Sequence, residues 1–213
     1  MNRTSEVMQE QKFLEFEKMY PPFYRDLETD LCLPQVAEGW EWCFDPSKCY
    51  LMEKLNGTNV KLVVENGLLT IWVRNQVHKR YVEATLNDPQ YKYIVQGVAT
   101  AIANRKKAFS DGVYYGEVIG EKYQGNPYQL HGHTWLTFKP FSGGAEVYRD
   151  YPKSANYEEW KTWMLNLKSI LNPKVLAEGV IFLNKETGQM AKLRRDMFDI
   201  SLQPKRNKYK KRK

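Results

Sequence analysis

The segment EKLNGTNVKLVVENGLLTIWVRN, residues 53–75, holds two runs of β-branched and apolar residues separated by Asn66-Gly67. An Asn-Gly pair readily adopts the left-handed backbone of a type I′ turn, so it is the strongest short-range signal for a β-hairpin. The segment therefore predicts two antiparallel strands that follow one another directly along the chain.

The turn also sets the register of this hairpin. Counting outward from it, Lys61 faces Trp72, and Asn59 faces Arg74. Directly opposed residues share one face of a sheet, with Cβ atoms about 4.5–5.5 Å apart. We therefore expect Arg74 near the start of the first strand, within reach of Lys54. A lysine and an arginine at one place favour an anion, and phosphate is the obvious candidate.

Strand-like and helix-like segments alternate through the rest of the chain. Helical spacing or composition predicts helices around Phe13–Tyr20, within residues 90–106 and over 156–171, the last with Asn156 as its cap and Asn172-Pro173 as its stop. Strands are expected at residues 113–121, 134–141 and 179–183. Hairpins with interspersed helices predict an α+β fold of mostly antiparallel sheet. We expect the tryptophans of 156–171, Trp160 and Trp163, to be core residues.

The charge of the chain is concentrated at one end. The formal net charge is +7, and the last nine residues, KRNKYKKRK, carry seven Lys and Arg, so 7 − 7 leaves a body of formal charge zero. We expect one folded domain over residues 1–204 and a disordered basic tail over 205–213. The tail is either a solvated end, a localisation signal or a flexible arm that contacts nucleic-acid phosphates.

The N-terminal residues and the hydropathy indicate where in the cell the protein is expected. No run of about 18 or more apolar residues occurs, which argues against a membrane span. The first residues, MNRTSEVMQEQKFLEF, lack the apolar core of a signal peptide. We therefore expect a cytoplasmic protein.

The cysteines and histidines give weak metal signals. Cys32, Cys43 and Cys49 are odd in number in a chain without a signal peptide, which predicts free thiols. Their spacing does not match a zinc site. His131 and His133 could hold a metal or a phosphate, but with no third ligand in sight the sequence favours a loop or surface role.

Several short motifs now follow one another in a specific order. EKLNGTN, residues 53–59, resembles motif I, Lys-x-x-Gly, of the covalent nucleotidyltransferases, which include DNA ligases, RNA ligases and mRNA capping enzymes. The later motifs match at Arg74 (motif Ia), Glu117 in YYGEVIG (III), Phe138 in LTFKPF (IIIa), Glu178 in AEGVIF (IV), and Lys192 and Arg194 in AKLRR (V). Each motif alone is weak, but the ordered set is specific. EKLNGTN looks most like the nick-sealing, type 2 RNA ligases of phages and their relatives.

The resemblance implies a fold and a reaction. The fold would be the ATP-grasp-like catalytic fold of the ligases, with mostly antiparallel sheets flanked by helices. Lys54 would attack the α-phosphate of ATP and form a lysyl-AMP intermediate. AMP would then pass to a 5′-phosphate end, and a 3′-hydroxyl would displace it to join the strands. A lysine attacks only as the neutral amine, which nearby cations favour, and Lys192, Arg194 and a metal would supply them.

The resemblance also implies roles for the other motif residues. Glu117 would accept a hydrogen bond from a ribose hydroxyl, and Phe138 would stack on adenine. Glu178 would help to bind the metal, Mg²⁺ or Mn²⁺. Taken alone, Glu117 and Glu178 could instead be solvent-facing strand ends, Phe138 could be a core residue, and 192–195 could be an exposed charge run.

Three further residues complete the expected site. Asn59 and Arg74 would contact the nucleotide or the 5′-phosphate end of the strand. Glu53 lies next to the nucleophile and would orient either the base or Lys54.

The chain departs from the family pattern at three places. Asn56 stands where many members have aspartate, and type 2 RNA ligases tolerate a non-acidic residue at this place, which favours RNA over DNA. Arg194 replaces the second lysine of motif V. Only nineteen residues follow Arg194, too few for the OB-fold of DNA ligases and capping enzymes, so we expect a stand-alone catalytic domain.

The sequence thus favours an ATP-dependent RNA ligase of strand or tRNA repair, acting on RNA that is nicked or has its ends held together. A DNA nick ligase is the nearest alternative, and a capping guanylyltransferase is a weaker one. A non-catalytic nucleic-acid-binding protein on the same fold is an alternative from another class.

Overall fold

The computed structural model describes residues 16–75, 80–105, 108–138 and 147–203. They divide into two compact units between which the chain passes three times. Unit 1 comprises Met1–Lys18 and Leu55–Glu146, and unit 2 comprises Met19–Lys54 and Val147–Lys213, each within the described residues. The basic tail at 205–213 lies outside the described residues. No helix in the described part of the chain is long and apolar enough to cross a membrane.

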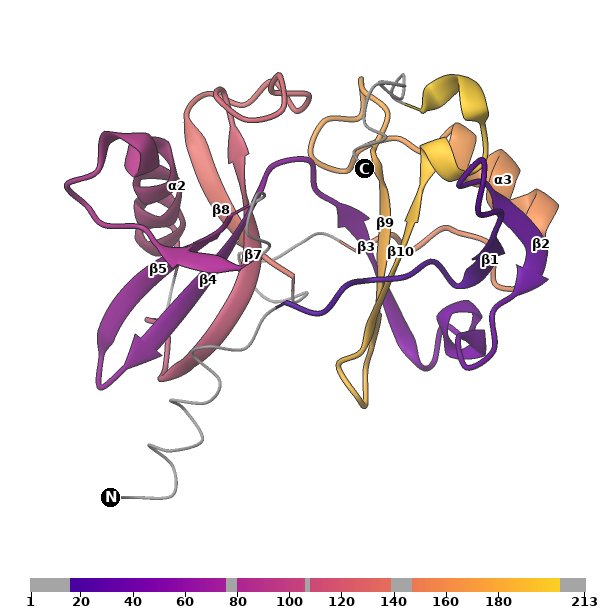
Figure 1. Cartoon of the computed structure of the whole chain (residues 1–213), viewed down its shortest axis with the longest axis horizontal. Helices are drawn as coiled ribbons and strands as arrows, with labels where there is room; N and C mark the ends of the chain where they lie inside the picture. The colour runs from indigo at the N-terminus through magenta and orange to yellow at the C-terminus, as the bar shows by residue number, and fades with distance from the viewer. Residues whose placement is uncertain (1–15, 76–79, 106–107, 139–146, 204–213) are drawn as a thin grey trace, which may run out of the picture. The chain divides into compact units, whose positions relative to one another are not determined.

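Unit 1 is a five-stranded antiparallel sheet with a helix on one face (Figure 1). The strand order is β6-β5-β4-β7-β8. The strands are β4 (Thr58–Glu65), β5 (Leu68–Arg74), β6 (Tyr81–Glu83), β7 (Gly112–Gly120) and β8 (His133–Thr137). A short 3₁₀ turn, η2 (Pro89–Tyr91), leads into the helix α2 (Lys92–Ala103).

The predicted hairpin is confirmed. Asn66 and Gly67 have φ values of 51° and 75°, the left-handed region that a type I′ turn requires. Lys61 pairs with Trp72 as expected, and the pairing extends to Val60 opposite Val73. One further step along this register places Asn59 opposite the last residue of β5, Arg74.

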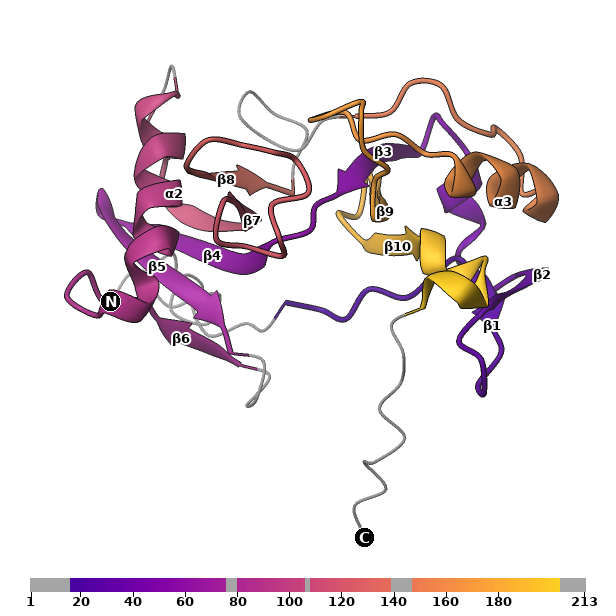
Figure 2. The ribbon, with the colours of Figure 1, turned by 90° about the horizontal axis from the view of Figure 1, so that it is seen from above.

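Strand alternation gives the sheet of unit 1 two different faces. One face packs against α2, which lies along it in Figure 2, and forms an apolar core. This core includes Val60, Leu62, Ile94, Val98, Val118 and Trp135. The other face carries Asn59 and Lys61 of β4 and Glu117 of β7, so the polar motif residues lie opposite the core.

Unit 2 contains a three-stranded and a two-stranded sheet. The three-stranded sheet, of order β10-β9-β3, is antiparallel and consists of β3 (Cys49–Lys54), β9 (Gly179–Asn184) and β10 (Met190–Arg194). The other pairs β1 (Phe23–Arg25) with β2 (Cys32–Val36). The helix is α3 (Tyr157–Leu165), and the 3₁₀ turns are η1 (Glu41–Phe44), η3 (Arg195–Met197) and η4 (Ile200–Leu202).

The core of unit 2 joins α3 to the three-stranded sheet. Trp160 and Met164 of α3 are fully buried and share one cluster with Leu51, Val180 and Phe182 of the sheet. The expected core role of the tryptophans is confirmed, since Trp163 packs on the same cluster. The α+β class with mostly antiparallel sheet is likewise confirmed in both units.

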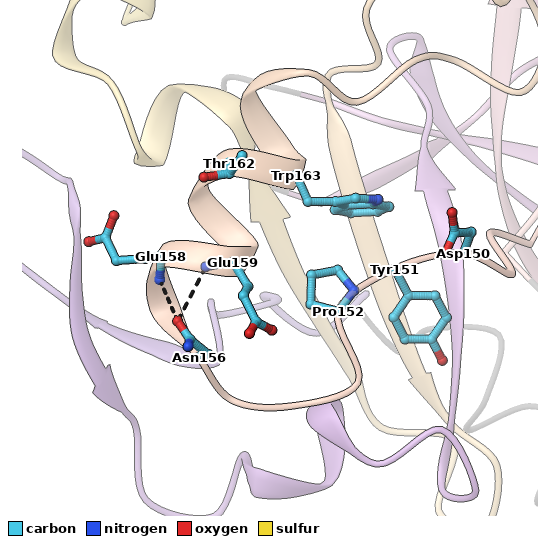
Figure 3. A pocket seen from close by; sticks show the side chains of 8 residues that line it. All are labelled: Asp150, Tyr151, Pro152, Asn156, Glu158, Glu159, Thr162 and Trp163. Carbon is cyan, nitrogen blue, oxygen red and sulfur yellow. Dashed lines mark hydrogen bonds between the residues drawn. The ribbon is translucent and has the colours of Figure 1, made fainter.

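The start of α3 is as expected, but its end is not. The Asn156 side chain accepts hydrogen bonds from the N–H groups of Glu158 and Glu159 (dashed in Figure 3). The helix ends at Leu165, whereas the sequence predicted a stop at Asn172-Pro173. The residues beyond it form a hairpin-like pairing instead, in which the Ala177 N–H donates to Leu167 O and Ser169 N–H to Val175 O.

Two further predictions concern the N-terminal part of the chain, namely a helix and free cysteines. The helix predicted around Phe13–Tyr20 is wrong for residues 16–20, which hold no helix, and its first residues lie outside the described part. The Tyr20 carbonyl instead accepts a hydrogen bond from the N–H of Lys192. The prediction of free thiols is confirmed, since all three cysteines are buried and unbridged.

Candidate active site

The nucleophile predicted by motif I is in an ion pair with the carboxylate predicted by motif IV. Lys54 is the last residue of β3, and Glu178 immediately precedes β9. Lys54 Nζ lies 2.8 Å from Glu178 Oε1, and the side chains are 18% and 27% exposed. Two residues separated by more than a hundred positions in sequence thus meet at a place that solvent can reach.

The register of the three-stranded sheet places motif V beside this pair. Lys54 of β3 and Arg194 of β10 are both opposite Gly179 of β9. Lys192 lies two residues before Arg194 and therefore on the same face. Three cations and the Glu178 carboxylate thus come from three adjacent segments of one sheet.

Gly179, the glycine of motif IV, permits this arrangement. A Cβ atom built on it would lie 2.2 Å from Leu193 O and 2.8 Å from Arg194 Cα. A side chain at this position would force β10 away from β9, and Arg194 with it. The Glu-Gly pair of motif IV is therefore explained by close strand packing as well as by chemistry.

Arg194 has an acidic neighbour that the sequence analysis did not identify. Its Nε lies 3.0 Å from Asp196 Oδ1 in an ion pair whose side chains are 34% and 17% exposed. Arg195, by contrast, turns toward the segment before Glu178, because its N–H donates to Glu178 O and its side chain to Ala177 O. The i, i+2 spacing of Arg194 and Asp196 is the only signal in the sequence for this pair.

Glu53 lies on the other face of β3 from Lys54. Its side chain is 1% exposed, and Oε2 accepts a 2.7 Å hydrogen bond from the Ile170 N–H. Burial raises the pKa of this carboxyl above its ordinary value, against hydrogen bonding that lowers it. Among the described residues its second oxygen, Oε1, has no hydrogen-bond partner.

In unit 1, the motif residues gather on the polar face of the five-stranded sheet. Asn59 of β4 is directly opposite Glu117 of β7. Arg74, at the end of β5, pairs with Tyr81 of β6. The Tyr81 hydroxyl donates a hydrogen bond to Asn59 Oδ1. Four neighbouring strands therefore contribute to one polar cluster.

Phe138 and Arg74 both contact Phe16, which precedes the first strand. Phe138 is 4% exposed, and its ring lies 5.3 Å from that of Phe16, which in turn lies 5.2 Å from Tyr115. Arg74 Nη1 donates to the Phe16 carbonyl at 3.3 Å. The packing of Phe138 agrees with its alternative interpretation as a core residue, and its role in stacking stays a prediction.

Lys61 is a buried cation that the sequence analysis placed in the hairpin but gave no role. It is 1% exposed, and its Nζ lies 4.5 Å from the ring centre of Tyr81 and 5.3 Å from that of Trp72. Cation–π contacts of this kind stabilise a lysine that has left water. The signal was available, because the hairpin register sets Lys61 against Trp72 and two residues from Asn59.

The turn that follows Lys54 is fixed by unit 1. A Cβ on Gly57 would lie 2.2 Å from Val118 O, so only glycine fits beside β7 at this point of motif I. The N–H of Asn56, one residue earlier, donates a 2.7 Å hydrogen bond to the hydroxyl of Tyr128. Neither contact was anticipated from the sequence.

The two histidines do not form a metal site. His131 is exposed, as expected, but His133 is 5% exposed, so the expectation of a loop or surface role is wrong for it. Its ring packs on Tyr93 and Tyr123, and Nε2 accepts from the Lys122 N–H. Within the described residues, no group of three or more His, Cys, Asp and Glu could hold a metal ion.

A shallow cavity of about 650 Å³ lies in unit 2 beside the N-terminal half of α3 (Figure 3). Its lining combines carboxylates with aromatic rings, among them Asp150, Glu159, Tyr151 and Trp163. None of the motif residues lines it. We therefore assign the candidate active site from the motif residues and not from this cavity.

Comparison with solved structures shows the same fold. A Naegleria gruberi RNA ligase mutant with ATP and Mn superposes with a TM-score of 0.53 at 16% identity, covering 87% of this chain and 59% of that one. The same ligase with PPi gives 0.51 at 15% identity, covering 90% and 65%. An apo mutant gives 0.50 at 17% identity, covering 71% and 50%. The chain thus spans between half and two thirds of the length of these ligases.

Sequence comparison gives the family. A search of curated proteins finds no match. The family model described as RNA ligase matches residues 47–207, which include the segments of motifs I to V. The match covers three quarters of the chain, and the chain belongs to the RNA ligase family.

Proposed function

We propose that this protein is an ATP-dependent RNA ligase that works through a lysyl-AMP intermediate. The observation that supports it best is the ion pair of Lys54 with Glu178, which is 2.8 Å long and whose side chains are both partly exposed. The family match and the fold shared with ligases that were solved with ATP and Mn support the same reaction class.

In the first step, the neutral amine of Lys54 attacks the α-phosphorus of ATP. A nitrogen–phosphorus bond forms, the bond from the α-phosphorus to the bridging oxygen breaks, pyrophosphate leaves, and the amine loses a proton. In the second step, AMP passes to the 5′-phosphate of an RNA strand and Lys54 is released. In the third, a 3′-hydroxyl attacks that phosphate, and AMP leaves as the strands join.

The cations of motif V support this chemistry electrostatically. Lys192 and Arg194 share a face of the sheet with Lys54, so they can oppose negative charge that develops on the phosphates. Asp196 Oδ1 lies beside Nε of Arg194, so the terminal nitrogens of the guanidinium are left to reach an anion.

Glu178 fits the expected divalent metal. Mg²⁺ in nucleotide sites is held by one or two carboxylates together with phosphates and water, so a single partly exposed carboxylate is sufficient on the protein side. A bound Mg²⁺ or Mn²⁺ would neutralise phosphate charge. Glu178 can hold either the Lys54 ammonium or a metal ion, so metal binding at Glu178 would release the amine for attack.

The residues of unit 1 are proposed to bind the nucleotide. Glu117 and Asn59 are opposed on the polar face of the sheet, where Glu117 would accept from the ribose and Asn59 would contact phosphate. Arg74 would contact phosphate through the nitrogens that it does not use on Phe16. Phe138 would stack on adenine, an interaction of about 1–3 kcal/mol.

Glu53 is proposed to orient the base. Its two oxygens differ, since Oε2 is bound to the Ile170 N–H while Oε1 has no partner among the described residues. An exocyclic amino group of adenine is a donor of the kind that Oε1 lacks. Of the two roles that the sequence left open, this asymmetry and the position of Lys54 on the other strand face favour the base.

Transfer of labelled AMP tests the proposed reaction. The protein is incubated with Mg²⁺ and ATP or GTP labelled on the α-phosphate, and then examined on a denaturing gel for covalently bound label that survives alkali and is lost in acid, as a phosphoramidate bond is. We expect AMP labelling that Lys54→Ala abolishes and that Lys174→Ala, a change at an exposed lysine, leaves intact. GMP labelling would indicate a capping enzyme, and no label with either nucleotide would leave a nucleic-acid-binding protein.

Defined nicks then test the substrate. We expect sealing of RNA nicks in preference to DNA nicks, and the opposite preference would indicate a DNA ligase. The basic tail is tested by deletion of residues 205–213. We expect the deletion to weaken strand binding, the salt dependence of that binding and nick sealing, while lysyl-AMP formation continues.

A further inference from the structure

We infer that Tyr128 is a positioning residue for the Lys54 nucleophile, an inference that rests on the proposed function. Tyr128 belongs to the loop of residues 121–132, which joins β7 to β8 and is seventy-two positions from its partner in motif I. Tyr128 belongs to none of the motifs identified in the sequence. Its role follows from where its hydroxyl is placed.

The Tyr128 hydroxyl holds the turn of motif I by its backbone. It accepts a 2.7 Å hydrogen bond from the Asn56 N–H, and the tyrosine is 4% exposed, so the bond is shielded from competing water. A second contact comes from the same loop, since Gln124 Nε2 donates to Gly57 O at 3.4 Å. Lys54 is separated from this turn by one residue, Leu55, which is itself buried.

The loop that carries Tyr128 is fixed at its base. The Lys122 N–H donates to His133 Nε2, and the Gly132 N–H donates to Glu121 Oε1. Nearer its tip, the Asn126 side chain bonds both the N–H and the carbonyl of Leu130. A loop held in this way can impose a position on the chain that it contacts.

The other side of the turn is fixed by β7. Gly57 is so close to the Val118 carbonyl that no Cβ could be accommodated there. The turn is therefore enclosed between the β7 backbone and the Tyr128 hydroxyl. Placement of a reacting atom within a fraction of an ångström governs the rate of such a reaction, so loss of one side of this enclosure should slow attack by Lys54.

Tyr128→Phe tests this inference, because it removes the hydroxyl and keeps the buried ring. We expect the rate of lysyl-AMP formation at saturating ATP to fall about fivefold to tenfold, as for one lost buried hydrogen bond, with an unchanged KM for ATP. The matched control is Tyr123→Phe in the same loop, whose hydroxyl has no hydrogen bond to any described residue. It is expected to keep the wild-type rate.

A purely structural role is distinguished by a reaction that bypasses the nucleophile. Joining of an RNA whose 5′-end already carries AMP needs no attack by Lys54, so Tyr128→Phe should leave the rate of that step near wild type while lysyl-AMP formation falls. A parallel fall of both reactions with the melting temperature would overturn the inference, as would a wild-type rate of lysyl-AMP formation. If the wild-type protein itself forms no lysyl-AMP, the proposed function fails instead.

Discussion

The three-stranded sheet of unit 2 and the five-stranded sheet of unit 1 each gather motif residues on one face, but by different means. In unit 2 the motif residues contact one another directly, as Lys54 contacts Glu178. In unit 1 they contact residues outside the motifs, since Asn59 bonds Tyr81 and Arg74 bonds the Phe16 carbonyl.

This difference indicates that the two sheets have different roles. The ion pair of unit 2 includes the reacting amine of Lys54, so loss of this pair should affect the chemical step. Contacts to Tyr81 and Phe16 fix the shape of a binding surface, so their loss should affect nucleotide affinity. Substitutions in the two sheets should therefore separate into effects on kcat and effects on KM.

The largest effect is expected from Glu178→Gln. The change keeps the size of the side chain but removes the charge that holds Lys54 and that would hold the metal. We expect lysyl-AMP formation to fall by roughly 10²-fold or more, in line with loss of one strong electrostatic contact at a reacting centre. Stability should change by less than about 1 kcal/mol, because the pair is partly exposed.

Glu186→Gln is the matched control for Glu178→Gln. Glu186 is exposed in the turn between β9 and β10, and it is not one of the motif residues. Its replacement should leave the AMP-labelling rate unchanged. Comparable losses in the two variants would mean that the Lys54–Glu178 contact has no special part in the reaction.

An intermediate effect is expected from Tyr81→Phe in unit 1. The variant keeps the ring that lies against Lys61 and loses the hydrogen bond to Asn59. A net hydrogen bond is worth about 0.5–1.5 kcal/mol, so the KM for ATP should rise about twofold to tenfold while kcat stays near wild type. Steady-state rates of labelling over a range of ATP concentrations measure both.

Tyr114→Phe provides the comparison on the opposite face of the same sheet. The Tyr114 hydroxyl donates to the Ser110 carbonyl in an exposed segment, and Tyr114 pairs with Leu62, three register positions from Asn59. Its loss should alter neither constant. If Tyr81→Phe lowers kcat and not the KM, the proposed division between the two sheets is wrong.

The hairpin, α2 and the cap at Asn156 were predictable because their signals are local. Asn66-Gly67 specifies its own turn, and the register then follows by counting. The end of α3 was not predictable in this way, because pairing between residues 167–169 and 175–177 competes with continued helix. No local sequence signal in residues 156–171 predicts that pairing.

The candidate site shows the same limit. Ordered motifs were enough to predict Lys54 and Glu178, which the fold brings into contact. Tyr128 and Asp196 were missed, since their roles depend on a backbone N–H and on a side-chain direction that no motif records. His133 was misplaced because a polar residue at the start of a strand gives no sign that two tyrosine rings will cover it.

The smallest effect is expected from the pH dependence of unit 1 through His133. Burial lowers the pKa of this histidine below its ordinary value, against the Glu121 carboxylate, which raises it, while Lys122 lowers it further. Neutral His133 accepts the Lys122 N–H at Nε2 and lies 3.0 Å from Gln96 Oε1 at Nδ1. Protonation would remove the acceptor that holds the base of the 121–132 loop.

The sign of the pH dependence of stability follows from proton binding in the folded and unfolded states. Between the lowered pKa and the ordinary value of about 6.5, the unfolded chain binds more protons at this site than the folded chain, so stability falls as the pH is lowered through this window. We expect the melting temperature of the wild type to drop more between pH 7.5 and 5.5 than that of His133→Gln, with exposed His131→Gln behaving as wild type. Equal slopes for all three would show that His133 is not charged on unfolding.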